Sequence, residues 1–251
     1  MKKFKVGDQV SGPAFLSGTY QQIVAYKEKE VAHKPSELSH QIGAAFGVIF
    51  LTTFQALKKL QVPSCGEKDS LKGKRVLIIG GSGGTGSAAV LLAKKYFGAD
   101  LVLAIASAKN SQFVQGLGAD QVLDYTTGKD DLTEKLKSLS GTFDIVLDTI
   151  GGYNDYYGVD VLKPNDVSVF VTIAGEVPKE TTVFGTRNAS FHVMNYNGEE
   201  YEKILNWIVQ DGLKDKIPIS HVFKLEDVAR AHQLIEAQRT VGKIILEIPQ
   251  Q

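Results

Sequence analysis

Residues 75–97 read RVLIIGGSGGTGSAAVLLAKKYF: an apolar run, a cluster of glycines and a second apolar run with helical character. Gly81, Gly83 and Gly86 match the pattern G-x-G-x-x-G between the two runs. Glycines so placed permit a tight turn, close approach of the backbone to a pyrophosphate, and close packing of helix on strand. The stretch therefore predicts a dinucleotide-binding unit, with a glycine-rich turn that binds no ligand as the alternative.

The alternation of apolar runs and helical segments continues after residue 97. Continuous apolar strands between helices indicate a parallel sheet that is covered on both faces. Six strand candidates suit a doubly wound α/β sheet of the Rossmann kind. The candidates are RVLIIG, LVLAIAS, QVLDY, FDIVLDTI, VSVFVTIAG and FHVMN, with helices expected in NSQFVQGLGA, DDLTEKLKSL and YNDYYGVDVL.

The segments on either side of this region differ in character. The run TYQQIVAY, residues 19–26, has the β-branched and aromatic content of a strand. One helix is expected after Ser39 and a second over residues 52–60. In the tail, helices at 199–211 and 226–237 alternate with the strands HVFKL and KIILEI.

Two other classes of glycine loop have similar spacing. Gly80, Gly84 and Gly86 fit the G-x-x-x-G-x-G pattern of short-chain dehydrogenases, which also need a Tyr-x-x-x-Lys pair on a helix. Tyr125 and Lys129 have that spacing, but TTG lies between them and a loop is expected there. The short-chain class remains an alternative. A P-loop is excluded, because serine rather than lysine follows the last glycine.

The segment about 20 residues beyond the glycine loop bears on the choice of cofactor. An NAD site has a carboxylate there that binds the ribose 2′-hydroxyl, whereas this sequence reads ASAKN at 106–110. The segment has no carboxylate to repel a 2′-phosphate, and Ser107, Lys109 and Asn110 offer donors to bind one. This segment therefore favours NADP over NAD. In the alternative interpretation, Lys109 is only a solvated lysine and binds no phosphate.

Composition excludes several other functions. The chain has 28 Lys+Arg against 28 Asp+Glu, so no cationic surface for nucleic acid or anionic lipid is expected. A single cysteine, Cys65, excludes an intramolecular disulfide. The longest apolar or glycine stretch, 43–51, is shorter than the roughly 18 residues that span a membrane. We expect a cytoplasmic protein that binds neither nucleic acid nor membrane.

Eight blocks along the chain match those of one known family, in that family's order. They are FKVGDQVSG, GTYQQIV, AHKPSELS, LTTFQAL, VLIIGGSGGTGSAAVLLAK, LGADQVLDY, FDIVLDTIGG and VGKIILEI. The chain thus resembles the medium-chain dehydrogenase/reductases, specifically the zinc-independent quinone oxidoreductase branch. The resemblance implies a Rossmann domain, 52–195, inserted into a GroES-like β-rich domain formed by 1–51 and 196–251. The first part of that second domain is expected to be missing, since FKVGD stands well inside it in the family.

The resemblance also implies which residues bind the cofactor. The pyrophosphate is expected at the glycine loop, the 2′-phosphate after the second and third strands, and the nicotinamide half after the fourth and fifth. The implied residues beyond the motif glycines are Thr52, Gly84, Thr85, Ser107, Lys109, Tyr125, Thr149, Ile150, Ala174 and Gly175. No catalytic side chain is carried over, because the segment that lines the cleft in enone-reducing relatives belongs to the missing part.

The sequence also bears on metal binding and on the nicotinamide pocket. The zinc-dependent branch needs Cys and His ligands, whereas the five histidines here have no metal-site spacing, so no metal is expected. Phe46 and Gly47 replace the usual Leu-Pro, and Phe50 replaces a usual glycine. We expect either change to reshape the pocket around the nicotinamide.

These observations predict an NADP(H)-dependent oxidoreductase that transfers a hydride to a small-molecule acceptor, namely a quinone, enone or related carbonyl compound. The alternative is an NADP(H)-binding protein with little or no catalysis, acting as a sensor or interaction partner. The strand FHVMN is expected at the sheet edge by which relatives dimerise, which predicts a homodimer.

Overall fold

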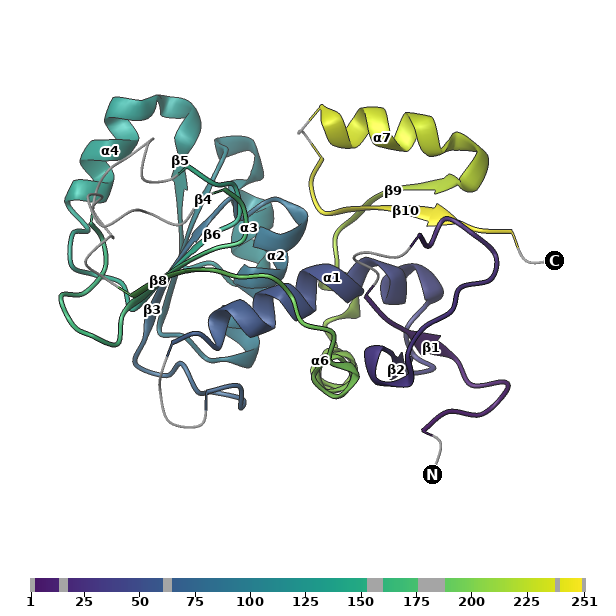
Figure 1. Cartoon of the computed structure of the whole chain (residues 1–251). Coiled ribbons are helices and arrows are strands. Elements are labelled where there is room, and N and C mark those ends of the chain that lie inside the picture. Colours follow the sequence, from purple (N-terminus) through teal and green to yellow (C-terminus); the bar gives the residue numbers. More distant parts are fainter. Residues whose placement is uncertain are drawn as a thin grey trace. The chain divides into compact units, whose positions relative to one another are not determined.

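The computed structural model describes residues 3–13, 18–60, 65–152, 160–175, 188–237 and 240–249. The chain divides into two compact units. Thr52–Val193 is called here the sheet unit, and Met1–Leu51 with Met194–Gln251 the flanking unit. Figure 1 follows the chain through both of them. Most of the expected helix YNDYYGVDVL lies outside the described residues.

A parallel sheet with helices around it forms the centre of the sheet unit (Figure 1). It has six strands in the order β5-β4-β3-β6-β7-β8. The chain runs from β3 outward through β4 and β5, and then returns to pair β6 with the other side of β3. This order confirms the doubly wound α/β fold. The strands are β3 (Arg75–Ile79), β4 (Leu101–Ala106), β5 (Gln121–Asp124), β6 (Ile145–Asp148), β7 (Val169–Thr172) and β8 (Asn188–Phe191).

The central strands are apolar except at their ends, as expected where both faces of a sheet are covered. Every residue of β6 and β7 is buried. On one face, Leu77, Val146 and Phe170 form a cluster with Leu132 and Leu136 of helix α4 (Lys129–Lys137). Burial of each such side chain stabilises the fold by about 1.5–3 kcal/mol. Alternating polar residues would have prevented this packing.

Short helices connect the strands of the sheet unit. Helix α2 (Gly84–Leu91) continues as the π-helical segment η2 (Leu92–Tyr96), and α3 (Ser111–Leu117) ends at Gly118. Two 3-10 turns, η3 (Ala108–Asn110) and η4 (Tyr125–Thr127), follow β4 and β5. Gly128, with φ +113, separates η4 from α4. Tyr125 and Lys129 are therefore not paired on one helix, which removes the support for the short-chain alternative.

The last strand begins earlier than the sequence predicted. Strand β8 occupies Asn188–Phe191, whereas the prediction was FHVMN, residues 191–195. Its residues pair with β7 from Val169↔Asn188 to Thr172↔Phe191. β7 ends at Thr172, whose carbonyl accepts the His192 amide at 2.8 Å, and no described strand extends the ladder beyond that point. β8 lies at the edge of the sheet, as expected.

In the described residues, the flanking unit contains two small sheets, the first part of helix α1 (His40–Leu57) and two further helices. Strand β1 (Val10–Ser11) pairs antiparallel with β2 (Ala32–His33), and β9 (Ile219–Lys224) pairs parallel with β10 (Lys243–Glu247). The further helices are α6 (Gly198–Gln210) and α7 (Val228–Glu236), with 3-10 turns at Glu28–Glu30, Lys214–Lys216 and Leu225–Asp227. The prediction of a strand in TYQQIVAY is wrong: Ile23 is 86% exposed, and no described strand pairs with this segment.

Helix α1 (His40–Leu57) is continuous, which corrects the prediction of two helices. Ser39 caps its first turn by accepting the Ile42 amide at 3.1 Å. The expected break before Thr52 is absent from this helix, because neither proline nor glycine interrupts residues 48–57. By length and composition α1 is apolar enough to cross a membrane, but 67% of it is buried inside the protein, as in a core helix.

Candidate cofactor site

The glycine loop, residues 80–86, follows β3 at the carboxyl edge of the sheet. The amides of Gly80 and Gly81 both donate to the Ile105 carbonyl of β4, at 3.1 and 3.0 Å. Gly80 has φ +83, a conformation that favours glycine, and its carbonyl accepts the Gly83 amide at 3.0 Å. The loop thus turns where the strand order reverses, which is where doubly wound sheets bind their ligands.

The three motif glycines differ in what a side chain at each would contact. A Cβ on Gly86 would lie 2.0 Å from the Gly80 carbonyl oxygen, and one on Gly81 would lie 2.8 Å from the Ala104 Cβ. A Cβ on Gly83 would come no closer than 3.5 Å to any protein atom outside its chain neighbours, and its φ of −71° suits any residue. The protein's own packing therefore requires Gly81 and Gly86, whereas a Cβ on Gly83 would have only the Gly80 carbonyl oxygen within 4 Å, so the space in front of it is largely open.

That open space adjoins the start of helix α2. Gly83 is the N-cap residue, and its hydrogen side chain cannot cap the helix. The amides of Gly84, Thr85 and Gly86 belong to the first turn, where backbone donors have no partner within the helix. With the helix dipole, they suit a phosphate group. The loop therefore fits a dinucleotide pyrophosphate by both its free space and its donors.

Thr52 lies in α1, at the first position of the sheet unit, and is 8% exposed. Its neighbour Thr53 is fully buried and directs its hydroxyl toward the Thr85 carbonyl at 3.4 Å. This part of α1 therefore lies against the glycine loop. The contact by Thr53 is an addition to the residues expected from the sequence.

The residues expected around the 2′-phosphate gather after β4 and β5. Lys109 is exposed on η3, and Tyr125 is 52% exposed on η4. Ser107 is only 4% exposed, so its hydroxyl is recessed at the base of this corner. Asn110 donates its side-chain amide to the Ser82 hydroxyl at 3.1 Å, which ties η3 to the glycine loop.

A carboxylate that the sequence reading did not single out lies in the same corner. Asp124, the last residue of β5, accepts the Ala108 amide at 2.9 Å and the Thr126 amide at 2.9 Å. The hydrogen bonds from Thr126, together with that from Ala108, lower the pKa of the Asp124 carboxyl. The 2′-phosphate corner thus contains a charged carboxylate, whose oxygen is already occupied by donors from both turns.

The residues expected along the nicotinamide half meet beside the glycine loop. A Cβ on Gly80 would lie 2.6 Å from the Thr149 hydroxyl, which shows how close the two loops are. Thr149 donates to the Ile79 carbonyl at 2.7 Å, and Ile150 is 66% exposed. The loops after β6 and β7 are also in contact, because a Cβ on Gly151 would lie 2.8 Å from the Ala174 carbonyl. Gly175 approaches the same glycine from β7.

Two buried polar residues shape these loops and were not anticipated from the sequence. Asp148, 1% exposed at the end of β6, accepts the amides of Ile150 and Gly151, each at 2.9 Å. Thr172, 1% exposed at the end of β7, accepts the Ala174 amide at 3.2 Å and donates to the Ala174 carbonyl. A polar residue that ends an otherwise apolar strand was the available signal for both.

Phe46 and Phe50, two departures from the family pattern, pack on each other in α1. Their ring centroids are 4.2 Å apart, and both side chains are buried. A Cβ on Gly47 would lie 2.9 Å from the Pro13 Cα, so the chain needs glycine there. The three residues serve packing within the flanking unit. That they also reshape the nicotinamide pocket stays a prediction.

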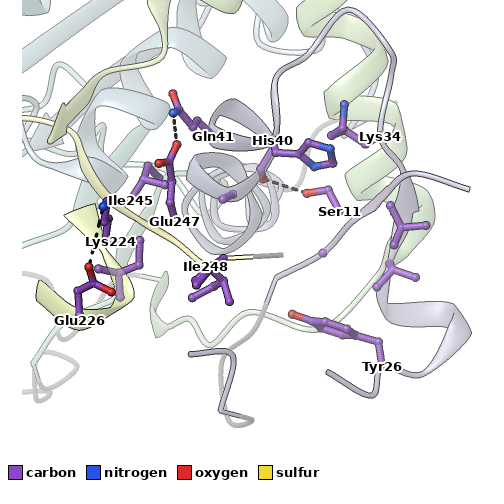
Figure 2. Close-up of a pocket in the computed structure, with 17 residues that line it drawn as sticks. Ser11, Tyr26, Lys34, His40, Gln41, Lys224, Glu226, Ile245, Glu247 and Ile248 are labelled. Carbon is purple, nitrogen blue, oxygen red and sulfur yellow. Dashed lines mark hydrogen bonds and ion pairs between the residues drawn. The ribbon is translucent and has the colours of Figure 1, made fainter. Parts of the chain in front are cut away.

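A pocket of about 700 Å³ lies within the flanking unit, and none of the expected cofactor residues lines it (Figure 2). Its polar side chains are largely engaged with the protein itself. Ser11 donates to the Gly43 carbonyl at 2.9 Å, and Gln41 donates to Glu247 at 2.6 Å.

Among the described residues, no group of three His, Cys, Asp or Glu side chains could hold a metal ion.

A family model described as zinc-binding dehydrogenase matches residues 117–246. Mitochondrial NAD(P)H oxidoreductase RTN4IP1 of Danio rerio is 30% identical over 273 residues, which cover 99% of this chain and 68% of that protein. The chain belongs to the medium-chain dehydrogenase/reductase superfamily. This confirms the resemblance to its quinone oxidoreductases.

Other similar proteins belong to the same superfamily. The 2-methylene-furan-3-one reductase of Solanum lycopersicum is 30% identical, over 98% of this chain and 59% of that protein. The quinone oxidoreductase structure from Coxiella burnetii has a TM-score of 0.77 and 26% identity, covering 98% of this chain and 74% of that one. The chain spans 42% to 68% of the length of the first curated relatives. These relatives are named as oxidoreductases or reductases.

Proposed function

We propose that this chain binds NADP(H) and serves in hydride transfer between its nicotinamide and a quinone, enone or related carbonyl acceptor. The observation that carries the proposal is the open space at Gly83, in front of the uncapped first turn of α2. Amides of Gly84, Thr85 and Gly86 would hold the pyrophosphate there. The superfamily relatives named as NAD(P)H oxidoreductases support the same cofactor class.

The choice of NADP(H) over NAD(H) rests on the corner after β4 and β5. Lys109 is exposed, and no ion-pair partner is found for it in the described part of the chain. Its ammonium and the Tyr125 hydroxyl are available to a 2′-phosphate. Asp124 would oppose the phosphate charge, but its oxygens are turned to backbone and threonine donors of the two turns.

The acceptor class rests on the relatives. One is named as a quinone oxidoreductase, and another as the reductase of a 2-methylene-furan-3-one, in which an alkene is conjugated to a ketone. When bound, the nicotinamide supplies the hydride. The protein residues described above bind and orient: the glycine loop holds phosphate, and the loops ordered by Asp148 and Thr172 shape the nicotinamide side.

The test measures binding and turnover separately. Fluorescence titration with NADPH and NADH gives the two dissociation constants, and NADPH oxidation is followed against a small panel of quinones and enones. We expect NADPH to bind at least tenfold more tightly, about 1.4 kcal/mol, with turnover of one acceptor class. Equal dissociation constants would contradict the cofactor choice. Tight NADPH binding without any turnover would favour the sensor or interaction role.

We further propose that the chain forms a homodimer through the outer side of β8. This strand ends the sheet order, and Phe191 on it is 45% exposed. Exposed strand edges pair readily with other strands, and charged residues on them oppose pairing. Sedimentation velocity of the wild type and of Phe191→Lys tests this. We expect the wild type to sediment as a dimer and Phe191→Lys as a monomer. A monomeric wild type would contradict the proposal.

A further inference from the structure

We propose that Asp124 is a positioning residue for cofactor selectivity: it joins the turns after β4 and β5 and so fixes Lys109 and Tyr125 at one 2′-phosphate site. The inference rests on the proposed binding of NADP(H). It assigns the selectivity to a residue that would not itself touch the phosphate. It also explains why a carboxylate is tolerated where an anion is to be bound.

The geometry of Asp124 joins two turns at a single oxygen. Its Oδ1 accepts the Ala108 amide from η3 at 2.9 Å, and the Thr126 amide and hydroxyl from η4 at 2.9 and 2.7 Å. The Thr126 hydroxyl also reaches Oδ2, at 2.8 Å. Lys109 follows Ala108 directly, and Tyr125 follows Asp124. The cross-link therefore sets the separation of the two side chains available to the phosphate.

The strand register makes this cross-link specific to the end of the sheet. Ala106 of β4 is paired with Asp124 of β5 in the last register position of the two strands. Beyond that position the backbones diverge into η3 and η4, and no described ladder hydrogen bond joins them. The carboxylate continues the connection by one more residue, through its side chain.

A second hydrogen bond holds η3 from its other end. The side-chain amide of Asn110 donates to the Ser82 hydroxyl of the glycine loop at 3.1 Å, and its backbone amide donates to the Ser107 carbonyl at 2.9 Å. Lys109 thus lies between one anchor to β5 and one to the glycine loop. A loop fixed before the ligand arrives loses less entropy on binding, and so binds more tightly.

The opposite end of the same strand pair offers a matched control. Asp120, just before β5, accepts a hydrogen bond from the Val102 amide of β4 at 2.7 Å. It also forms an ion pair with Lys94 at 2.8 Å. It is a carboxylate that bridges the same two strands, but at the amino edge, away from the glycine loop. Asp120→Ala therefore removes a comparable bridge without touching the cofactor corner.

The experiment compares Asp124→Ala, Asp124→Asn and Asp120→Ala with the wild type. Fluorescence titration gives the NADPH and NADH dissociation constants, and amide hydrogen exchange of the cofactor-free protein reports on Ala108. For Asp124→Ala we expect NADPH binding about tenfold weaker, NADH binding within about twofold of the wild type, and faster exchange at Ala108. Asp124→Asn retains an acceptor oxygen, so NADPH binding and Ala108 protection are expected to stay near the wild-type values.

Three outcomes would overturn the inference. One is NADPH binding to Asp124→Ala that is unchanged or tighter, since the carboxylate would then act only by repulsion. Another is that Asp124→Ala and Asp120→Ala both weaken NADPH binding and NADH binding to the same extent, which would mean that the two carboxylates have only a general structural role. The third is unchanged Ala108 exchange in Asp124→Ala. If the wild type binds NADPH no more tightly than NADH, the proposed function is contradicted. The hydrogen exchange of Ala108 then still tests whether Asp124 joins the two turns.

Discussion

The carbonyl oxygen of Gly80 lies 2.0 Å from the point where a Cβ on Gly86 would stand. Strand β3 and helix α2 can come this close only because Gly86 lacks a side chain. Gly83, three residues earlier in the same loop, has no such contact. The same motif therefore contains two glycines that the packing needs, Gly81 and Gly86, and one, Gly83, at which a Cβ would fit.

Alanine at Gly86 and at Gly83 should separate stability from binding. Gly86→Ala forces helix and strand apart, and we expect it to cost about 3 kcal/mol or more of unfolding free energy. Gly83→Ala should cost no more than about 1 kcal/mol, mainly as a poorer N-cap, yet weaken NADPH binding at least tenfold. Thermal unfolding and fluorescence titration of both variants test this. Full NADPH affinity in Gly83→Ala would show that the open space is not the phosphate site.

Lys109 provides the second prediction. Removal of its ammonium in Lys109→Ala should weaken NADPH about tenfold, or 1.4 kcal/mol, and leave NADH unchanged, because only the 2′-phosphate distinguishes the two ligands. The NADPH dissociation constant of the wild type should rise more steeply with salt than that of the variant. Lys95→Ala, which removes an exposed lysine on η2, serves as the charge control. Parallel losses for both cofactors would contradict the assignment.

The sheet unit was predictable because its signals are local. Apolar runs such as LVLAIA and IVLD are buried at nearly every position, and their order determines the parallel sheet. The motif glycines were found by spacing, and the turn after β4 by its distance from them. The bridge by which Asp124 joins the turns that carry Lys109 and Tyr125 was not predicted, because the sequence analysis treated Asp124 only as part of a strand. A side-chain bridge between two turns has no one-dimensional pattern.

The flanking unit was predicted less well, for a physical reason. A strand such as TYQQIVAY forms only when neighbouring strands pair with it, and Ile23 is 86% exposed in a segment that none of the described strands joins. Helix α1 continues through Thr52 and Thr53 because both threonines are buried by tertiary contacts, which outweigh their weak helix propensity. Neither outcome is encoded in the local residues alone.

Asp148 provides the third prediction, at the nicotinamide side. Asp148→Ala leaves the amides of Ile150 and Gly151 without this acceptor in a part-buried setting, which should cost about 1–3 kcal/mol of unfolding free energy. Asp148→Asn keeps one acceptor oxygen and should cost less. Because both cofactors share the nicotinamide half, NADPH and NADH binding should weaken in parallel. Urea unfolding and titration measure the two effects, and a cofactor-selective loss would argue against this placement.

The last prediction concerns acid. Hydrogen bonds from Thr126 and Ala108 lower the pKa of Asp124 below its ordinary value of 3.8, so the ionised carboxylate stabilises the folded state. That contribution is fully present above pH 3.8 and is lost as the pH falls through the lower, folded-state pKa. The unfolding free energy of the wild type should therefore exceed that of Asp124→Asn at pH 7, and the difference should shrink below pH 3.8. Urea unfolding of both proteins across this range measures the difference directly. A gap that widens with acid would mean that the carboxylate is held at a raised pKa, and that its bonds to the two turns do not favour the charged form.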